Sequence, residues 1–408
     1  MAALYFFSYF QRIAIPGTIF NELQSNFALS AGGVAALGAI YLYIYTGMQI
    51  IAGVMADRFG ARRVLLAGGA LLAAGSILFP LAHTTALLYA TRALVALGAS
   101  LIYLCLVKEV DELFGAKNFI LVLGICLFVG YTGGLFGTLP FERLTRSIGW
   151  RNSLLLAGIV CGAAWIGSLI FLRNGMTRPR GAVSPLPAIR QILTNRPGYP
   201  VLVSGTINFG IYYTFQATIG KKLLQDCCGF SSSRAATFTF VAMLTMMLCI
   251  LVYGAISRRP GARRPLLLGI TIGLLLSSGL MALNLATVCA PALMLAGFII
   301  LGAAGASAPL FAGVFKDLNP PEAVATSIGV LNSGCYLCVA VLAQLCGLVL
   351  DRYASAARIT PTAIVYPVAA YQALLIICMI LAGISLISVC FIRENRPQRI
   401  TADKVAGG

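Results

Sequence analysis

Long apolar runs, separated by short polar segments, occupy most of this 408-residue chain. Each run is close to the roughly 20 residues that a helix needs to cross the hydrocarbon core of a membrane. Because backbone N–H and C=O groups in lipid must be satisfied within the segment itself, each run is predicted to be a helix. The pattern therefore predicts an all-α membrane protein with twelve transmembrane helices, at residues 2–21, 33–55, 64–82, 86–107, 118–139, 150–172, 199–220, 233–255, 265–284, 290–312, 323–348 and 369–392.

The polar segments divide the chain into two halves. The longest, residues 173–198, holds five arginines and no acidic residue, and we expect it to be a cytoplasmic linker. It separates an N-terminal six-helix bundle (1–172) from a C-terminal one (199–392), and residues 393–408 are expected to form a cytoplasmic tail. If the chain starts on the cytoplasmic side, 19 of the 29 Lys and Arg fall in cytoplasmic segments and 8 in outer ones. This excess predicts that both termini are cytoplasmic.

Composition excludes several classes of protein. Hydrophobic residues make up 59% of the chain and charged residues 10%, whereas soluble domains carry about 25% charged residues, so a soluble enzyme is excluded. With His83 as its only histidine, the chain cannot hold a haem between two histidines. The net charge of +17 follows from the basic cytoplasmic loops and predicts no nucleic-acid partner.

The 12 cysteines lie mostly inside apolar runs, where we expect them to pack as small hydrophobic residues. Cys227 and Cys228 are adjacent and are expected in an outer loop. The pair Cys335 and Cys338 lacks the second pair of ligands that a zinc site needs. We therefore expect no metal, no cofactor and no enzymatic activity.

Two basic segments repeat one another at half the chain length. Residues 53–68 and 254–269 are identical at nine of sixteen positions, and each lies between the second and third spans of its own half. A repeat of this kind is typical of transporters in which two six-helix bundles rock about a central site. It predicts pseudo-symmetric bundles.

The first copy of this repeat resembles the signature loop of the major facilitator superfamily. Its Gly53, Gly60 and basic residues match that signature, although the second copy has Arg258 where the first has Asp57. Arg92 with Gly98, and Gly149 followed by Trp150 and Arg151, are similar to other elements of the family. The resemblance implies a multi-pass carrier of the bacterial inner membrane that works by alternating access. It also implies that the loop latches the halves together on the cytoplasmic side, with gating residues Asp57, Arg58, Arg62 and Arg63.

Two arginines lie inside the predicted spans, Arg12 in the first and Arg92 in the fourth, while all 12 acidic residues lie at span ends or in loops. A buried guanidinium without a carboxylate partner is suited to bind an anion through its planar fork. We hypothesise that Arg12 binds a carboxylate or phosphate of the substrate, and the segment from Tyr9 to Arg12 resembles bacterial organic-anion carriers. The alternative is that Arg12 bonds helix carbonyls or extends to the membrane interface. For Arg92 a structural role is favoured, although it remains a substrate-binding candidate.

Polar side chains recur at four-residue spacing in several otherwise apolar spans, and so share a helix face. Such a stripe is unfavourable against lipid, so it is predicted to line the substrate cavity or to face another helix. Tyr9 shares a face with Arg12 by its three-residue spacing. The further substrate-binding candidates are Tyr41 with Tyr45, Asn208 with Tyr212 and Gln216, and Asn332 with Tyr336.

These observations predict a secondary or facilitative transporter of a small organic anion, working as a monomer. A proton-coupled exporter of amphipathic compounds, or a carrier of amino acids or short peptides, remains an alternative. The chain has no P-loop motif, which argues against direct use of ATP. No carboxylate lies in mid-span, which favours exchange against a counter-substrate or facilitated uptake; proton coupling through Glu22, at the end of the first span, is the alternative.

Overall fold

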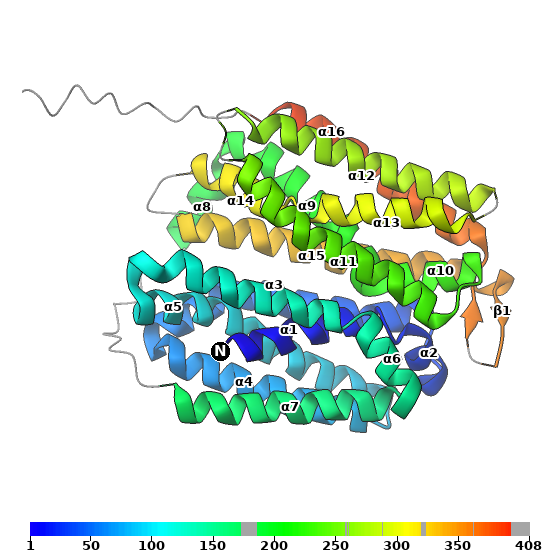
Figure 1. Cartoon of the computed structure of the whole chain (residues 1–408), viewed down its shortest axis with the longest axis horizontal. Coiled ribbons are helices and arrows are strands. Elements are labelled where there is room, and N and C mark those ends of the chain that lie inside the picture. The colour runs from blue at the N-terminus through cyan, green and yellow to red at the C-terminus, as the bar shows by residue number, and fades with distance from the viewer. Residues whose placement is uncertain are drawn as a thin grey trace, which may run out of the picture.

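The computed structural model describes residues 1–172, 186–319 except 258, 260 and 288, and 324–392 except 362. Within its helices, the side chains of residues 50, 57, 111, 112, 114–121, 186, 188, 324 and 325 lie outside this description. The helices form two stacked bundles (Figure 1), one made of α1 to α7 and the other of α9 to α16. The arrangement is the all-helical, two-bundle architecture that the apolar runs predict.

The N-terminal bundle begins with a broken helix. Pro16 has no backbone N–H and disfavours the helical conformation of the residue before it, so the first helix ends at Ala14 and helical structure resumes at Phe20. The elements are α1 (Ala2–Ala14), α2 (Phe20–Phe27), α3 (Ala31–Phe59), α4 (Ala61–Leu78), η1 (Phe79–Leu81), α5 (Thr85–Phe136), α6 (Leu139–Ile148) and α7 (Trp150–Phe171).

The C-terminal bundle repeats this plan. Its first span is interrupted by the π-helical segment η3 (Phe215–Ile219), which joins α9 (Tyr199–Thr214) to α10 (Gly220–Cys228). The other elements are α8 (Leu186–Thr194), η2 (Arg196–Gly198), α11 (Ser232–Ile256), α12 (Arg263–Ala286), α13 (Pro291–Gly305), α14 (Ala308–Asp317), α15 (Val324–Arg352), η5 (Ala354–Ala356), β1 (Arg358–Ile359), β2 (Ile364–Val365) and α16 (Val368–Cys390).

The twelve expected spans correspond to helices, with corrections to their continuity. Within the described residues, nine helices are long and apolar enough to cross a membrane by themselves. The first and seventh spans are broken as described above, and the fifth is bent by 45° between α5 and α6. The fourth and fifth spans lie in one helical segment, α5, whose 52 residues would measure about 78 Å if straight, far more than one membrane crossing needs. The two-residue strands β1 and β2 pair antiparallel and are a small addition to the all-α prediction.

Close packing of α4 against α5 accounts for Gly98 in the fourth span. A Cβ at Gly98 would collide with the backbone of Leu72 and with the carbonyl of Gly68 on α4. Small residues let helix backbones approach closely in a membrane. Gly98 therefore has a packing role and holds α5, which carries Arg92, against the bundle.

The two halves touch along α3 and α15, and this contact is closed at one end and open at the other. A Cβ at Gly347 would lie 2.6 Å from the Cα of Gly32, so the two helices are in direct contact there. Gly329 lies five turns before Gly347 on the same face of α15. A Cβ at Gly329, or at Gly47 further along α3, would meet no atom of the described residues within 4 Å. The helices therefore diverge toward the end that holds Gly329.

The closed end of this contact is the end with α2, α6, α10 and the β1–β2 ribbon, which we call the ribbon end (Figure 1). Side-chain hydrogen bonds join the halves there. The hydroxyl of Ser30 donates to Asp351 over 2.8 Å, and the amide of Gln24 donates to the Tyr366 hydroxyl over 3.0 Å. The opposite end, which holds α8 and the last residues of α7 and α16, is called the linker end.

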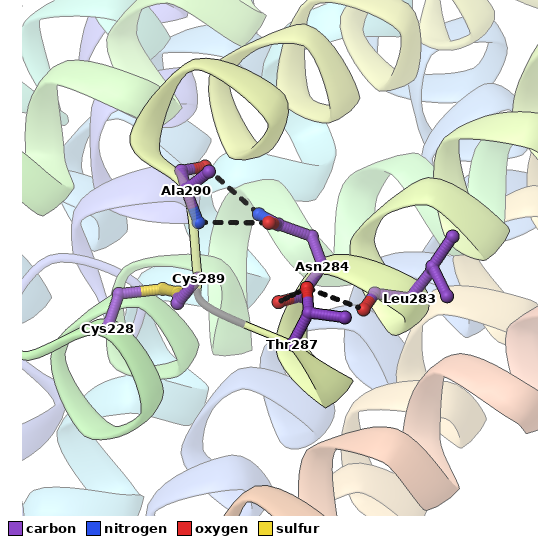
Figure 2. The surroundings of a disulfide bond; sticks show 6 residues. All are labelled: Cys228, Leu283, Asn284, Thr287, Cys289 and Ala290. Atoms are coloured by element: carbon purple, nitrogen blue, oxygen red, sulfur yellow. Dashed lines mark hydrogen bonds between the residues drawn. A yellow bond between two sulfur atoms is a disulfide. The ribbon is translucent and has the colours of Figure 1, made fainter.

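A disulfide at the ribbon end joins Cys228 of α10 to Cys289, in the loop between α12 and α13 (Figure 2). The same loop is held by Asn284, whose side chain donates to the carbonyl of Ala290 and accepts from its N–H, over 3.0 and 2.9 Å. The sequence placed Cys228 in an outer loop but did not predict its pairing. The partner is 61 residues away, and tertiary packing alone brings it near.

Candidate functional site

Arg12 occupies the last turn of α1, and its side chain is buried with 2% exposure. The position follows from the break at Pro16, because α1 ends only two residues beyond Arg12. A cation in the last turn of a helix is favoured by the helix dipole. The broken first span therefore holds a positive charge deep inside the molecule.

Four tyrosine rings surround the guanidinium of Arg12 and form what we call the tyrosine cage: Tyr9, Tyr41, Tyr45 and Tyr336. Their ring centres lie 4.6, 5.7, 4.3 and 4.8 Å from the central carbon of the guanidinium. At these distances the electron-rich ring faces attract a cation. The cage combines α1 and α3 of the N-terminal half with α15 of the C-terminal half. Tertiary packing has thus assembled four of the residues that the sequence proposed.

The hydrogen bonds of Arg12 leave much of its donor capacity unused. Its Nη1 donates to the Tyr336 hydroxyl over 2.5 Å, which joins the two halves directly. Its Nε and Nη2 are buried and have no partner in the described part of the chain, and none of the ion pairs found there involves Arg12. The Ser8 hydroxyl and the Gln11 side-chain oxygen on the same helix are also buried, with no partner among the described residues. The site therefore offers a charge and free donors to an anion.

Arg92 differs from Arg12, because each of its three side-chain nitrogens already donates a hydrogen bond. Its Nε donates to the carbonyl of Leu37 over 3.1 Å, its Nη1 to Gln11 over 3.0 Å and its Nη2 to Ile15 over 2.6 Å. Two of these carbonyls belong to the end of α1, where helical partners are lacking. Arg92 thus caps the broken helix that carries Arg12. These contacts agree with the structural role favoured for Arg92 from the sequence, and its part in substrate binding stays a prediction.

The polar stripe of the seventh span bonds other helices of the C-terminal bundle, which is one of the two placements expected for it. Asn208 donates to Thr271 over 2.9 Å and accepts from Ser385, both within the C-terminal bundle. The Tyr212 hydroxyl contacts the Met243 sulfur, and Gln216 donates to the carbonyl of Thr239. These three side chains therefore hold α9 and η3 against the helices around them.

The neighbouring positions on α9 face the cage instead. The rings of Phe209 and Tyr213 lie 5.4 and 6.3 Å from the ring of Tyr336, and the buried Tyr213 side chain lies within electrostatic reach of Arg12. The sequence reasoning missed both, because it followed the amide side chains rather than the aromatic ones. Asn332 is half-buried, one turn before Tyr336 on α15.

The candidate gating residues lie at the linker end, between α3 and α4. Asp57 is in the last turn of α3, but its side chain lies outside the described part of the structure. Arg62 donates to the carbonyl of Leu172 over 2.8 Å, within its own half. Arg58 and Arg63 are exposed, and the guanidinium of Arg58 lies 5.4 Å from the ring of Phe59. Their role as a latch stays a prediction.

Glu22, the coupling candidate, is half-buried on α2 at the ribbon end. It lies within electrostatic reach of Lys221 and Lys222 of α10. Lys222 also donates to Asn21 over 2.8 Å and pairs with Asp226 at 3.2 Å, so charges from both halves meet here. Glu22 is thus part of the closed ribbon end, ten residues after Arg12 along the chain, and its coupling role stays a prediction.

Comparison with known proteins identifies the family. The model of the Major Facilitator Superfamily matches residues 1–343, most of the chain. This chain belongs to the major facilitator superfamily. The crystal structure of the nucleoside transporter NupG shares its fold, with a TM-score of 0.74 at 14% identity, covering 97% of this chain and 98% of that one. The fold and the family confirm a multi-pass membrane transporter.

Two relatives of this chain have names that indicate different substrates. Monocarboxylate transporter 11 of Mus musculus is 27% identical over 317 residues, which cover 74% of this chain and 69% of the relative. Multidrug resistance protein MdtL of Escherichia coli is 27% identical over 366 residues, covering 88% and 86%. The relatives therefore agree on transport, and the choice of substrate rests on the site.

Proposed function

We propose that this transporter carries a small organic monoanion, a monocarboxylate, bound at Arg12 inside the tyrosine cage. The observation that carries the proposal is the unused donor capacity of Arg12, whose Nε and Nη2 are buried without a partner in the described residues. A carboxylate can accept both N–H groups side by side, as the planar fork of arginine favours. A monocarboxylate transporter among the relatives agrees with this substrate class.

The arginines also limit the charge of the substrate. Arg92 is the second buried guanidinium at this depth, and three backbone carbonyls occupy its Nε, Nη1 and Nη2. It therefore offers little to a second carboxylate. A dianion at this site would bury one charge without a cation, which is strongly unfavourable. The site accordingly favours one negative charge over two.

The same contact links binding to alternating access. Arg12 of the N-terminal half bonds Tyr336 of the C-terminal half, so an anion on Arg12 acts at the boundary between the two moving bodies. The α3–α15 contact is closed at the ribbon end and open toward the linker end. A substrate would reach Arg12 from the linker end in this conformation.

The orientation in the membrane follows from charge and from the disulfide. Disulfides persist on the oxidising side of a membrane, and Cys228–Cys289 lies at the ribbon end. The basic residues Arg62, Arg63 and Arg264 lie near the opposite end, which the positive-inside rule places in the cytoplasm. We infer an outer ribbon end and a cytoplasmic linker end, in a cell membrane such as the bacterial inner membrane.

Binding of a radiolabelled monocarboxylate, such as pyruvate or benzoate, to the purified transporter in proteoliposomes tests the proposal. We expect Arg12→Gln to abolish binding and Arg12→Lys to weaken it at least tenfold, because lysine lacks the planar fork. Arg234→Gln is the matched control, since Arg234 also lies over an aromatic ring, Phe230 at 4.4 Å, but is exposed at the ribbon end. Binding that survives Arg12→Gln unchanged would refute the assignment.

An exporter of amphipathic compounds is the second candidate. The relative MdtL covers more of this chain than the monocarboxylate transporter does, and the rings around Arg12 give a mixed apolar and polar surface. This function predicts efflux of neutral or cationic amphipathic compounds that does not depend on Arg12. The Arg12→Gln variant therefore separates the two functions in one transport assay.

A further inference from the structure

Tyrosines are concentrated around the proposed anion site to an unusual degree. Three more continue the cage along α1 toward the linker end, and we call Tyr5, Tyr103 and Tyr131 the tyrosine track. Tyr5 lies edge-on to Tyr9 at 5.3 Å and stacks on Tyr103 at 5.6 Å, while Tyr131 lies edge-on to Tyr9 at 5.1 Å. Together with Tyr213, and with Tyr212 whose ring lies 6.3 Å from that of Tyr213, nine of the 16 tyrosines in the chain form one connected cluster around Arg12.

Two rings of the track, Tyr103 and Tyr131, are the most exposed of this cluster, whereas Tyr5 is only 4% exposed. Tyr41 and Tyr45 of the cage are 0% and 2% exposed, so a ligand cannot reach Arg12 through them in this conformation. Tyr103 and Tyr131 of the track, by contrast, are half-buried. Their rings pack on Tyr5 and Tyr9 of α1, the helix that carries Arg12, so the two half-buried rings connect to the anion site through these contacts.

Distances along α1 set the size of a ligand that would occupy both parts. Tyr9 is three residues and Tyr5 seven residues before Arg12, which corresponds to about 4.5 and 10 Å along the helix axis. An acid whose carboxylate bonds Arg12 would therefore place an attached ring at the level of Tyr9, and a second fused ring near Tyr5.

We propose that the preferred substrates are aromatic monocarboxylates, with the carboxylate on Arg12 and the ring against the tyrosine track. The proposal rests on the proposed function and makes it more specific. Aromatic rings favour stacked and edge-on neighbours at 4.5–7 Å, and the track already shows both arrangements among its own rings. The tyrosine hydroxyls keep the track compatible with water when no substrate is bound, which leucine or phenylalanine side chains would not.

Benzoate and cyclohexanecarboxylate form a matched pair of probes, because they share charge and ring size but differ in aromatic character. We expect the wild-type transporter to bind benzoate about three to ten times more tightly than cyclohexanecarboxylate. Tyr131→Leu should remove most of that preference, whereas Tyr131→Phe should keep it, since phenylalanine retains the ring. Tyr103→Leu provides a second test on a different part of α5.

Tyr253→Leu is the matched control, because Tyr253 is a half-buried tyrosine of α11 outside the cluster, and it should leave the preference unchanged. Equal binding of the two acids, both lost in Arg12→Gln, would overturn the aromatic preference and leave the monocarboxylate function standing. If both acids bind regardless of Arg12, or neither binds, both proposals fail. A preference for benzoate that survives Tyr131→Leu and Tyr103→Leu would also overturn the role of the track.

Discussion

Replacing each buried arginine by methionine, which is apolar and similar in length, is expected to have opposite effects on stability and on ligand binding. Arg92→Met removes three hydrogen bonds to backbone carbonyls at the break of the first span. Arg12→Met removes one hydrogen bond to the Tyr336 hydroxyl and the attraction of four tyrosine rings. We therefore expect stability to depend on Arg92 and ligand binding to depend on Arg12.

The magnitude for Arg92 follows from its bonds. Side-chain hydrogen bonds within membrane proteins average about 0.6 kcal/mol each and reach about 1.7. Three of them give a loss of about 2 to 5 kcal/mol in the free energy of unfolding. The larger values apply if the carbonyl of Ile15 finds no new partner in the variant. No helical bond replaces the one from Arg92, because the amide of Ile19 donates to the carbonyl of Pro16 instead. We expect Arg92→Met to lower the Tm by several degrees.

For Arg12→Met the stabilising and destabilising contributions to the free energy of unfolding nearly cancel. Each ring contributes about 0.5 to 2 kcal/mol of attraction, while removal of a buried charge with two unpartnered nitrogens relieves a desolvation penalty of several kcal/mol. We expect a Tm close to that of the wild type, or above it, as is common where a functional site is strained.

Thermal unfolding of the purified variants in detergent, with and without saturating benzoate, measures both effects. Benzoate should raise the Tm of the wild type and of Arg92→Met but not of Arg12→Met, because a ligand stabilises only a protein that binds it. The reasoning is refuted if Arg92→Met unfolds like the wild type, or if Arg12→Met is the less stable of the two.

Two further predictions concern the ribbon end. Cys228→Ser should lower the free energy of unfolding by up to about 4 kcal/mol, because the disulfide closes a loop of 61 residues. A reducing agent should then lower the Tm of the wild type but not that of the variant. An equal response of the two proteins would contradict the bond to Cys289. Gly347→Leu should force α3 and α15 apart at their closed contact and favour opening of the ribbon end. Spin labels at Asn26 and Ile359, in opposite halves, should then show longer distances, and an unchanged distance distribution would show that this contact does not hold the end closed.

Much of the fold could be predicted from the sequence, because the lipid imposes one rule on every span. Apolar runs of membrane length must be helices, so their number and order follow from hydropathy alone. The breaks were not predicted, even though Pro16 marks one of them. A break at membrane depth is tolerated only where other groups satisfy the freed carbonyls, and those groups, such as Arg92, come from helices distant in sequence.

The candidate site was predicted in part. Periodicity identified the faces of α1, α3 and α15 that carry Arg12, Tyr45 and Tyr336, and the structure brings these faces together. On α9 the same reasoning selected Asn208, whose amide bonds Thr271 and Ser385 in its own bundle. A polar stripe shows only that a helix face avoids lipid. It does not show whether that face meets a cavity or a neighbouring helix.

The sequence by itself determined that this chain is a membrane protein of two related halves, with two arginines at membrane depth. Arg12 and Arg92 look alike in sequence, since each is a lone cation in an apolar run without an acid nearby. Only the tertiary structure separates them, by placing three carbonyls around one and four tyrosine rings around the other. The physical reason is that hydrophobicity acts locally and without direction, whereas hydrogen bonds require a partner at a defined distance and angle, which only the packing of distant helices provides.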